Sequence, residues 1–153
     1  MNQILRGEPL TVFGDGSQRR AFSYVGDIIH PIAIAPTVDS ASNEIFNIGA
    51  DNVYSVTELA DAVATAMGNV DPQITYLEAR DEVHTAFSDH SKAVAVFGEH
   101  ANTSLDTGLA KIATWVSKVG ARATPIFENI EIKQKLPRSW ASAVNIEENS
   151  STC

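Results

Sequence analysis

The stretch LTVFGDGSQRRAFSYVGD, residues 10–27, decides the fold that we expect for this chain. Its first four residues are apolar and predict a short strand over residues 10–13. The next four, Gly14-Asp15-Gly16-Ser17, have the composition of a turn. Alternating aromatic residues then predict a second strand over residues 21–25. Because Arg20 immediately precedes this strand, we expect its guanidinium at the strand's edge.

Outside this stretch the chain alternates between short strands and amphipathic helices. The strongest helix signal is the capping box Ser55-Val56-Thr57-Glu58, in which the serine and glutamate side chains satisfy backbone donors reciprocally. The expected helices cover residues 25–32 (kinked or shortened by Pro31), 56–67, 90–97 (capped by Asp89) and 105–119 (capped by Ser104), and the further strands cover residues 44–48 and 73–77. This order predicts an α/β fold, namely a small mixed α/β lobe whose sheet is too small for a whole doubly wound domain.

The two ends of the chain differ from its middle. Residues 1–6 have the pattern of the last turn of a helix, with Gly7 as its stop. A helix this short is not stable alone, so we expect a lobe that is truncated on its N-terminal side. From residue 121 the apolar pattern fades, and the polar residues 141–153 are expected to be disordered. We therefore expect one lobe over residues 1–140 and a tail over residues 141–153.

Composition excludes several classes of protein. The 153 residues carry 11 basic and 19 acidic side chains, a net charge of −8, and the longest basic run is Arg19-Arg20. A nucleic-acid-binding module needs a continuous basic stripe, so we expect no nucleic-acid partner. No apolar run is long enough to span a membrane, and the N-terminus lacks the apolar stretch of a secretion signal. The one cysteine, Cys153, permits no intrachain disulfide, and we expect a cytoplasmic protein.

Several catalytic and cofactor motifs are missing from the sequence. The histidines, at positions 30, 84, 90 and 100, have no metal-ligand spacing, so no metal site is expected. No serine lies in a G-x-S-x-G motif, which argues against a hydrolase. The Gly14-x-Gly16 pair has Arg19 where a dinucleotide fingerprint needs glycine. The sequence therefore predicts neither a catalytic group nor an NAD site in this chain.

Two arginines remain as candidate ligand-binding residues. Arg20 follows the glycine turn, and Arg80 lies just after the strand expected over residues 73–77. Guanidinium groups match phosphate oxygens in bidentate geometry, so two of them on neighbouring loops could clamp a diphosphate. On spacing alone, an arginine at either position is more often a residue of a surface ion pair.

A resemblance to a known family favours the first interpretation. Residues 10–27 are similar to the start of the sugar-nucleotide-binding lobe of NAD-dependent epimerases/dehydratases, a group of extended short-chain dehydrogenases/reductases, with UDP-glucose 4-epimerase as the closest type. Further similar segments follow in the family's order: Phe46-Asn47-Ile48-Gly49, Ser55-Val56-Thr57-Glu58-Leu59, Arg80-Asp81-Glu82-Val83, Asp89-His90-Ser91-Lys92-Ala93, Thr103-Ser104-Leu105-Asp106-Thr107-Gly108-Leu109 and Phe127-Glu128-Asn129-Ile130-Glu131-Ile132. The resemblance extends over residues 2–140.

The resemblance implies roles for four residues. Arg20 and Arg80 match the two arginines that grip the nucleotide diphosphate. Glu82 matches the acid that meets the ribose hydroxyls, and Phe13 lies in the segment that lines the base. The resemblance therefore implies that the chain binds the UDP part of a UDP-sugar, whereas the identity of the sugar stays open.

The family keeps its NAD loop and its catalytic Tyr-x-x-x-Lys pair in a preceding Rossmann domain. In this chain Tyr24, Tyr54 and Tyr76 are followed four residues later by Ile28, Glu58 and Arg80. We therefore interpret the chain as the C-terminal fragment of a nucleotide-sugar epimerase, an isomerase of carbohydrate metabolism. Its expected partners are a UDP-sugar and either a separate Rossmann half or a second copy of itself. The alternatives are a stand-alone non-catalytic nucleotide-binding module, a self-associating module, or the lobe of a related sugar-nucleotide dehydratase, reductase or decarboxylase.

Overall fold

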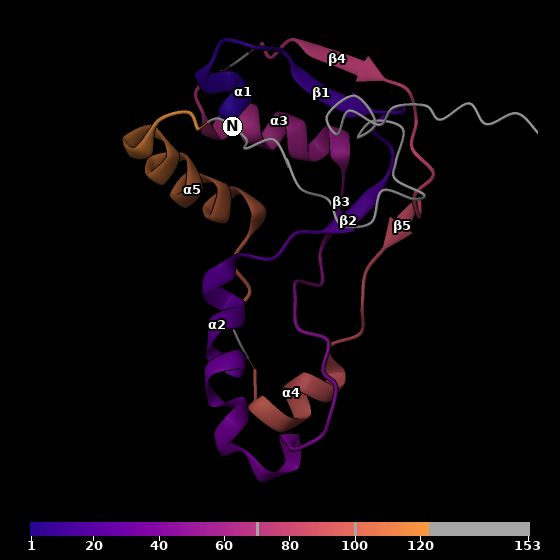
Figure 1. Ribbon diagram of the computed structural model, residues 1–153, viewed down its shortest axis with the longest axis vertical. Helices are drawn as coiled ribbons and strands as arrows, with labels where there is room; N and C mark the ends of the chain where they lie inside the picture. Colours follow the sequence, from indigo (N-terminus) through magenta and orange to yellow (C-terminus); the bar gives the residue numbers. More distant parts are fainter. Residues whose placement is uncertain (70, 100, 123–153) are drawn as a thin grey trace, which may run out of the picture. The chain divides into compact units, whose positions relative to one another are not determined.

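The computed structural model describes residues 1–69, 71–99 and 101–122 of the chain (Figure 1). Residues 1–121 form one compact unit. The expectations for residues 127–132 and for the tail over residues 141–153 lie outside the described residues. As the sequence predicts, short strands and helices combine into a small mixed α/β fold.

The first sheet has two parallel strands. Strand β1, Leu10–Phe13, pairs with β4, Ile74–Leu77, with Leu10 opposite Ile74 and Phe13 opposite Leu77. Leu10 and Val12 are 7% and 2% exposed, as the period of two in a strand requires. Both strands confirm the sequence prediction, with β4 starting one residue later than expected.

The second sheet has β2, Arg19–Ala21, at its centre. On one side β2 pairs antiparallel with β3, Val53–Ser55, and on the other side it pairs parallel with β5, Thr85–Ala86. The predicted second strand over residues 21–25 is therefore wrong in its bounds. The strand ends at Ala21 because its antiparallel partner begins at Val53, and α2 starts at Val25. The sequence did not predict the short strands β3 and β5.

Helices α3 and α5 pack against each other. Helix α3, Val56–Ala66, follows β3 directly and begins with the predicted capping box: Ser55 Oγ accepts from the Glu58 amide at 3.1 Å, and Glu58 Oε2 accepts from the Ser55 amide at 2.6 Å. Helix α5, Leu105–Val119, is capped by Ser104 as predicted. The two helices are in contact, and their buried apolar residues include Ala60 and Ala64 of α3 and Leu109, Ala113 and Val116 of α5. Small residues allow the close approach of two helices, so this face is part of the core.

Helix α2, Val25–Ile34, contacts α4, Ser91–Phe97. Pro31 lies inside α2 and is buried, and the helix continues only as far as Ile34 before two short 3₁₀ turns, η1 (Ala35–Thr37) and η2 (Asp39–Ala41). The residue that caps α4 is His90 rather than the predicted Asp89. Asp89 still contributes, because its Oδ1 accepts from the Ser91 amide at 2.8 Å and this bond lowers the pKa of the Asp89 carboxyl.

The N-terminal helix was predicted correctly, whereas the strand predicted over residues 44–48 was not. Helix α1, Asn2–Leu5, ends before Gly7, which has a positive φ of 70°, as the sequence predicts. The strand predicted over residues 44–48 is absent, because this segment has no paired strand in the described part of the chain. None of the described helices has the length and hydrophobicity that a bilayer crossing requires.

Candidate functional site

The parallel pairing in both sheets brings the predicted site residues into one region. Phe13 ends β1 and Arg20 lies in β2. Their partners β4 and β5 are joined by residues 78–84, the segment that carries Arg80 and Glu82. Because both pairs are parallel, this segment runs beside the turn that joins β1 to β2. The four predicted site residues, up to 69 positions apart in the sequence, therefore lie on or directly beside two neighbouring connections.

The Arg20 guanidinium forms hydrogen bonds with residues of the 78–84 connection. Its Nη2 donates to Glu82 Oε2 at 3.0 Å, and its Nη1 donates to the carbonyl oxygens of Arg19 at 2.8 Å and His84 at 3.1 Å. The two charged side chains are 27% and 39% exposed, so the pair is reachable from solvent. A phosphate oxygen approaching Arg20 would compete with the Glu82 carboxylate for the same guanidinium.

Arg80 lies against Phe13. Its Cζ is 3.4 Å from the centre of the Phe13 ring, a distance at which a guanidinium stacks on an aromatic face. The Phe13 carbonyl in turn accepts from Gln18 Nε2 at 2.8 Å. The structure thus places Arg80 with Phe13 and Arg20 with Glu82, in two pairs that share the 78–84 connection. Phe13, the predicted aromatic residue, therefore contacts Arg80, and Glu82, the predicted acid, pairs with Arg20.

The glycine turn is held rigidly beside this connection. Asp15 Oδ1 accepts from the amide and the hydroxyl of Ser17 at 2.9 and 2.6 Å, and these bonds lower the pKa of the Asp15 carboxyl. Ser17 Oγ also lies 3.1 Å from His84 Nε2. The turn and the 78–84 connection are therefore joined by Ser17–His84 as well as by Arg20–Glu82. Sequence reasoning gave no role to His84, because a lone histidine has no local signal for a partner 67 positions away.

The glycine turn has no space beside Gly14 and Gly16 for the pyrophosphate of a dinucleotide. A Cβ at Gly16 would meet Thr57 Oγ1 and Val12, and one at Gly14 would meet Gln18 Nε2 at 3.1 Å and Ala79 at 3.5 Å. The space that a pyrophosphate needs next to such glycines is thus filled by the protein's own side chains. The described turn therefore does not fit NAD.

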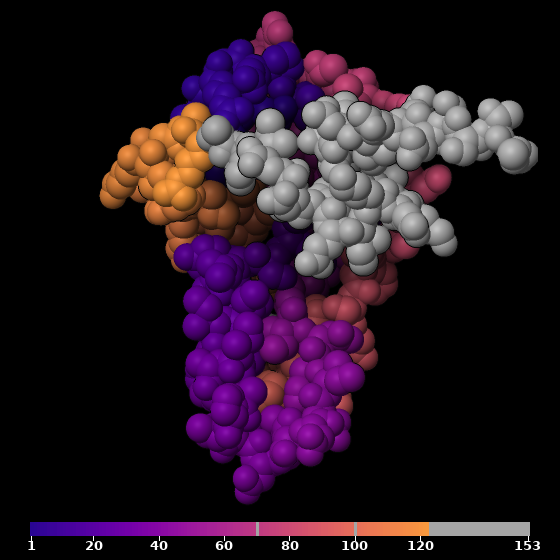
Figure 2. All heavy atoms as spheres, viewed as in Figure 1, coloured from indigo at the N-terminus to yellow at the C-terminus, as the bar shows by residue number. Residues whose placement is uncertain are grey.

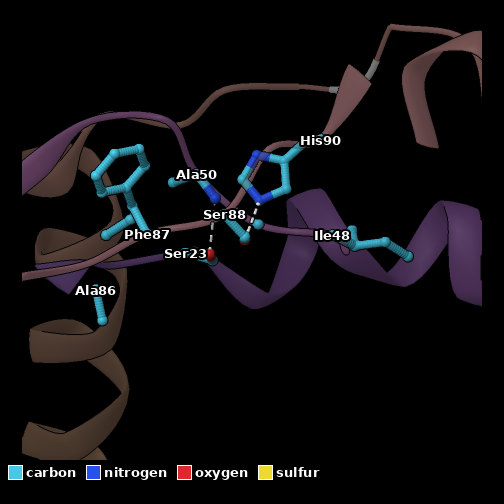
Figure 3. A pocket seen from close by; sticks show the side chains of 9 residues that line it. Ser23, Ile48, Ala50, Ala86, Phe87, Ser88 and His90 are labelled. Carbon is cyan, nitrogen blue, oxygen red and sulfur yellow. Dashed lines mark hydrogen bonds between the residues drawn. The ribbon is translucent and has the colours of Figure 1, made fainter. Parts of the chain in front are cut away.

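A cavity of about 350 Å³ lies at the other end of β2 and β5 (Figure 3). Its lining residues are Ala21, Ser23, Ile48, Gly49, Ala50, Ala86, Phe87, Ser88 and His90. Neither Arg20 nor Arg80 lines it, although Ala86 is paired with Arg20 in the sheet. The cavity is therefore separate from the two arginine pairs.

A buried histidine forms part of the cavity wall. His90 is 6% exposed, and Figure 3 shows its ring directed at Ser88, whose Oγ lies 2.9 Å from His90 Nε2. The other ring nitrogen, Nδ1, lies 2.9 Å from Asp51 Oδ1. Sequence reasoning missed this network, whose only local signal is the Ser88-x-His90 spacing. The Asp51 side chain is 75% exposed, and the network ties the loop after residue 48 to the start of α4.

Comparison with known proteins identifies the family of the chain. The model of the NAD dependent epimerase/dehydratase family matches residues 1–49. UDP-glucuronic acid decarboxylase 1 of Danio rerio is 31% identical over 117 residues, which are 76% of this chain and 27% of the relative.

Two solved structures share the fold. The UDP-glucuronic acid 4-epimerase of Bacillus cereus, in complex with UDP-glucuronic acid and NAD, is 27% identical and superposes with a TM-score of 0.70. The UDP-glucose 4-epimerase of Thermotoga maritima, with UDP-glucose, is 28% identical with a TM-score of 0.69. Each match covers 77% of this chain and 38% of the solved chain, so this chain spans between about a quarter and two fifths of the length of these relatives. From its sequence and its fold, the chain belongs to the NAD-dependent epimerase/dehydratase family.

Proposed function

We propose that this chain binds the UDP end of a UDP-sugar and forms the substrate-binding lobe of a nucleotide-sugar epimerase of the UDP-glucose 4-epimerase type. The observation that carries the proposal is the position of residues 78–84, which put Arg80 beside Phe13 and Glu82 beside Arg20. An acidic chain can hold an anion only with a few arginines that are placed for it. Two arginines on adjacent connections meet that requirement.

Each of the four residues has a role in the proposal. Arg20 and Arg80 bind the diphosphate, since a guanidinium fork matches phosphate oxygens. Phe13 supplies an apolar face for the base, and base–aromatic stacking is worth about 1–3 kcal/mol. Glu82 releases Arg20 to the phosphate and accepts hydrogen bonds from the ribose hydroxyls. The proposed lobe covers residues 1–140, of which residues 123–140 lie outside the described part.

The chemical step belongs to groups that this sequence does not contain. Solved relatives hold NAD together with a UDP-sugar, whereas this chain has no dinucleotide fingerprint and no Tyr-x-x-x-Lys pair. In the proposal this chain contributes binding energy remote from the reacting carbon, and a separate Rossmann half contributes NAD and the acid/base pair. Such remote binding holds the substrate while another domain acts on the sugar.

Calorimetric titration of the whole chain with UDP tests this proposal. We expect saturable binding of UDP, and at least tenfold weaker binding for Arg20→Ala and for Arg80→Ala. Lys111→Ala is the matched control, because Lys111 is also a cation over an aromatic ring, 4.4 Å from the centre of Tyr24, but lies on α5. Absence of UDP binding at millimolar concentration by folded protein, or equal binding by all three variants, contradicts the proposal.

A decarboxylase lobe is the second candidate. It is favoured by the 31% identity to UDP-glucuronic acid decarboxylase 1. Competition between UDP-glucose and UDP-glucuronic acid tests the sugar: preference for the uncharged sugar supports the UDP-glucose 4-epimerase type, whereas preference for the charged sugar contradicts it and fits either a decarboxylase or an epimerase of UDP-glucuronic acid.

A further inference from the structure

Ser88, His90 and Asp51 form a chain of hydrogen bonds at the wall of the cavity in Figure 3. Ser88 Oγ lies 2.9 Å from His90 Nε2, and His90 Nδ1 lies 2.9 Å from Asp51 Oδ1. An ionised carboxylate can only accept, so Nδ1 carries the ring proton and donates to Asp51. Nε2 is then the acceptor of the neutral ring, and the Ser88 hydroxyl donates to it. This is the order of groups in a serine nucleophile, its general base and the acid that orients the base.

The exposure of these side chains suits that chemistry. His90 is 6% exposed, so its ring is held in one orientation, whereas Ser88 is exposed and open to a ligand. Ser88 follows β5, and Asp51 lies on the segment between η2 and β3, which runs beside it (Figure 2). The missing G-x-S-x-G motif excludes one fold that carries such a triad, because triads are defined by geometry and recur in unrelated chain orders.

The cavity leaves space for a reacting group directly beside the histidine. A Cβ at Gly49 would lie 3.2 Å from His90 Nε2 and 3.1 Å from Ser23 Oγ, so both atoms border the small volume that glycine leaves open. Ser23 Oγ accepts from the Ala50 amide at 2.9 Å, and its own proton is donated to no other group in the described part of the chain. The Ser23 hydroxyl is therefore available to donate to an oxyanion that develops in this volume.

The lining of the cavity indicates the kind of substrate. Its volume of about 350 Å³ is at the lower end of the range for small-molecule sites. Ala21, Ile48, Ala86 and Phe87 give it apolar walls, and the described residues that line it include no Lys, Arg, Asp or Glu. Such walls suit an uncharged, largely apolar group, whereas an ionised group would find no oppositely charged partner there.

We propose that this chain hydrolyses small, uncharged carboxylic esters in the cavity, an activity that is independent of UDP binding. Ser88 Oγ attacks the carbonyl carbon of the ester while its proton passes to His90 Nε2, and Ser23 donates to the oxyanion of the tetrahedral intermediate. The bond to the alcohol oxygen then breaks, and His90 gives the proton to the leaving alcohol. A water molecule activated by His90 releases the carboxylic acid from Ser88 and restores the hydroxyl. Asp51 is a positioning residue, since it acts through His90.

A fluorophosphonate probe tests the nucleophile on the whole chain. Such probes phosphorylate activated serines, and mass spectrometry locates the label. We expect Ser88 to react at least a hundredfold faster than Ser17, the matched control within the same molecule. Ser17 Oγ also lies 3.1 Å from a histidine, His84 Nε2, but it donates to Asp15, and His84 Nδ1 faces the Thr85 hydroxyl instead of a carboxylate.

Hydrolysis of para-nitrophenyl butyrate tests the reaction and the supporting residues. Ser88→Ala should lower kcat/KM at least a hundredfold. Ser23→Ala should lower kcat with little change in KM, because an oxyanion donor acts on the transition state. Asp51→Asn should lower kcat at least tenfold and should also reduce the Nδ1–H tautomer of His90 in heteronuclear NMR spectra, a change that a loss of stability alone would not produce.

Four outcomes overturn the inference: no label on Ser88, equal labelling of Ser17, undiminished hydrolysis by Ser88→Ala, or labelling of Ser88 without continuous release of butyrate. Circular dichroism establishes that Ser88→Ala is folded. Titration of the same variant with UDP keeps the two proposals apart. We expect it to bind UDP as the wild-type chain does, so a failure of UDP binding refutes only the nucleotide site.

Discussion

Arg20 and Arg80 use the same functional group in different ways. The Arg20 guanidinium has a carboxylate partner and two carbonyl partners, whereas the Arg80 guanidinium lies over the Phe13 ring. A guanidinium that lies over a ring can still form hydrogen bonds with its N–H groups, so Arg80 can bind an anion without leaving Phe13. Arg20 must first exchange Glu82 for the anion. We therefore expect the two positions to respond differently to conservative substitution.

Arg80→Lys tests the stacked geometry. Lysine keeps the charge but cannot stack as a plane or form a bidentate pair, so we expect UDP to bind about tenfold more weakly. Arg19→Lys is the control on the neighbouring strand, since Arg19 donates to the Val53 carbonyl instead of stacking. The measurement is calorimetric titration of both variants. Wild-type affinity in Arg80→Lys would show that only the charge at this position matters.

Glu58 predicts how stability depends on pH. Hydrogen bonds with the amide and hydroxyl of Ser55 lower the pKa of the Glu58 carboxyl below its usual 4.5. A carboxyl with a lowered folded-state pKa stabilises the fold fully above pH 4.5, and this contribution is lost as the pH falls through the lower folded-state value. We expect Glu58→Gln to be less stable than wild type at pH 7 and to lose less stability between pH 5 and pH 3. Urea denaturation at several pH values measures both, and parallel curves for the two proteins would contradict the assignment.

At the scale of elements, the glycine turn between β1 and β2 fixes the positions of these two strands relative to α3. Its Gly16 carbonyl contacts the start of α3, where it accepts from the Thr57 amide at 3.1 Å. Gly16 has a φ of 77°, in the left-handed region that favours glycine. The turn therefore joins the first strand, the second strand and the start of α3 at one residue.

Gly16→Ala should destabilise the chain through two effects. The positive φ costs about 1–2 kcal/mol for any residue with a Cβ, and the new methyl group would also meet Thr57 and Val12. Gly68→Ala separates these effects, because Gly68 has a φ of 71° but no atom within 4 Å of the added Cβ. We expect Gly68→Ala to cost about 1–2 kcal/mol and Gly16→Ala to cost more, about 3 kcal/mol or above. Equal losses in urea denaturation would show that the turn can move away from α3.

At the scale of the molecule, the described unit buries little of its larger apolar surface. Its buried apolar residues are Leu10, Val12, Ala60, Ala64, Ala93, Leu109, Ala113 and Val116, half of them alanine. Large side chains such as Ile45 and Phe87 are 86% and 71% exposed. Ligands and partners that cover part of this surface should therefore have a measurable effect on stability.

UDP should stabilise the whole chain by linkage. A ligand that binds only the folded state at 100 times its Kd adds about 2.7 kcal/mol to the free energy of unfolding. We expect the Tm to rise with UDP concentration in wild type and to rise less at every UDP concentration in Arg20→Ala. NAD at the same concentration is the control, and should leave the Tm unchanged because the glycine turn does not fit it. An equal rise with NAD would show that the stabilisation is not specific to UDP.

The helices and the individual strands of the first sheet follow from local sequence, whereas the site and the pairing of strands in both sheets depend on distant residues. The capping box starts α3 and Ser104 caps α5 because the groups that satisfy their first amides lie within three residues. The Arg20–Glu82 pair spans 62 positions and the His90–Asp51 pair spans 39, so no local pattern could predict either. Residues 44–48 show the same division: the sequence predicts a strand there, and the described structure has none, because a strand also needs a neighbour and only the tertiary structure decides whether one is present. Local hydrogen bonds can thus be deduced from the sequence, while pairing between distant segments is determined only when the whole chain has folded.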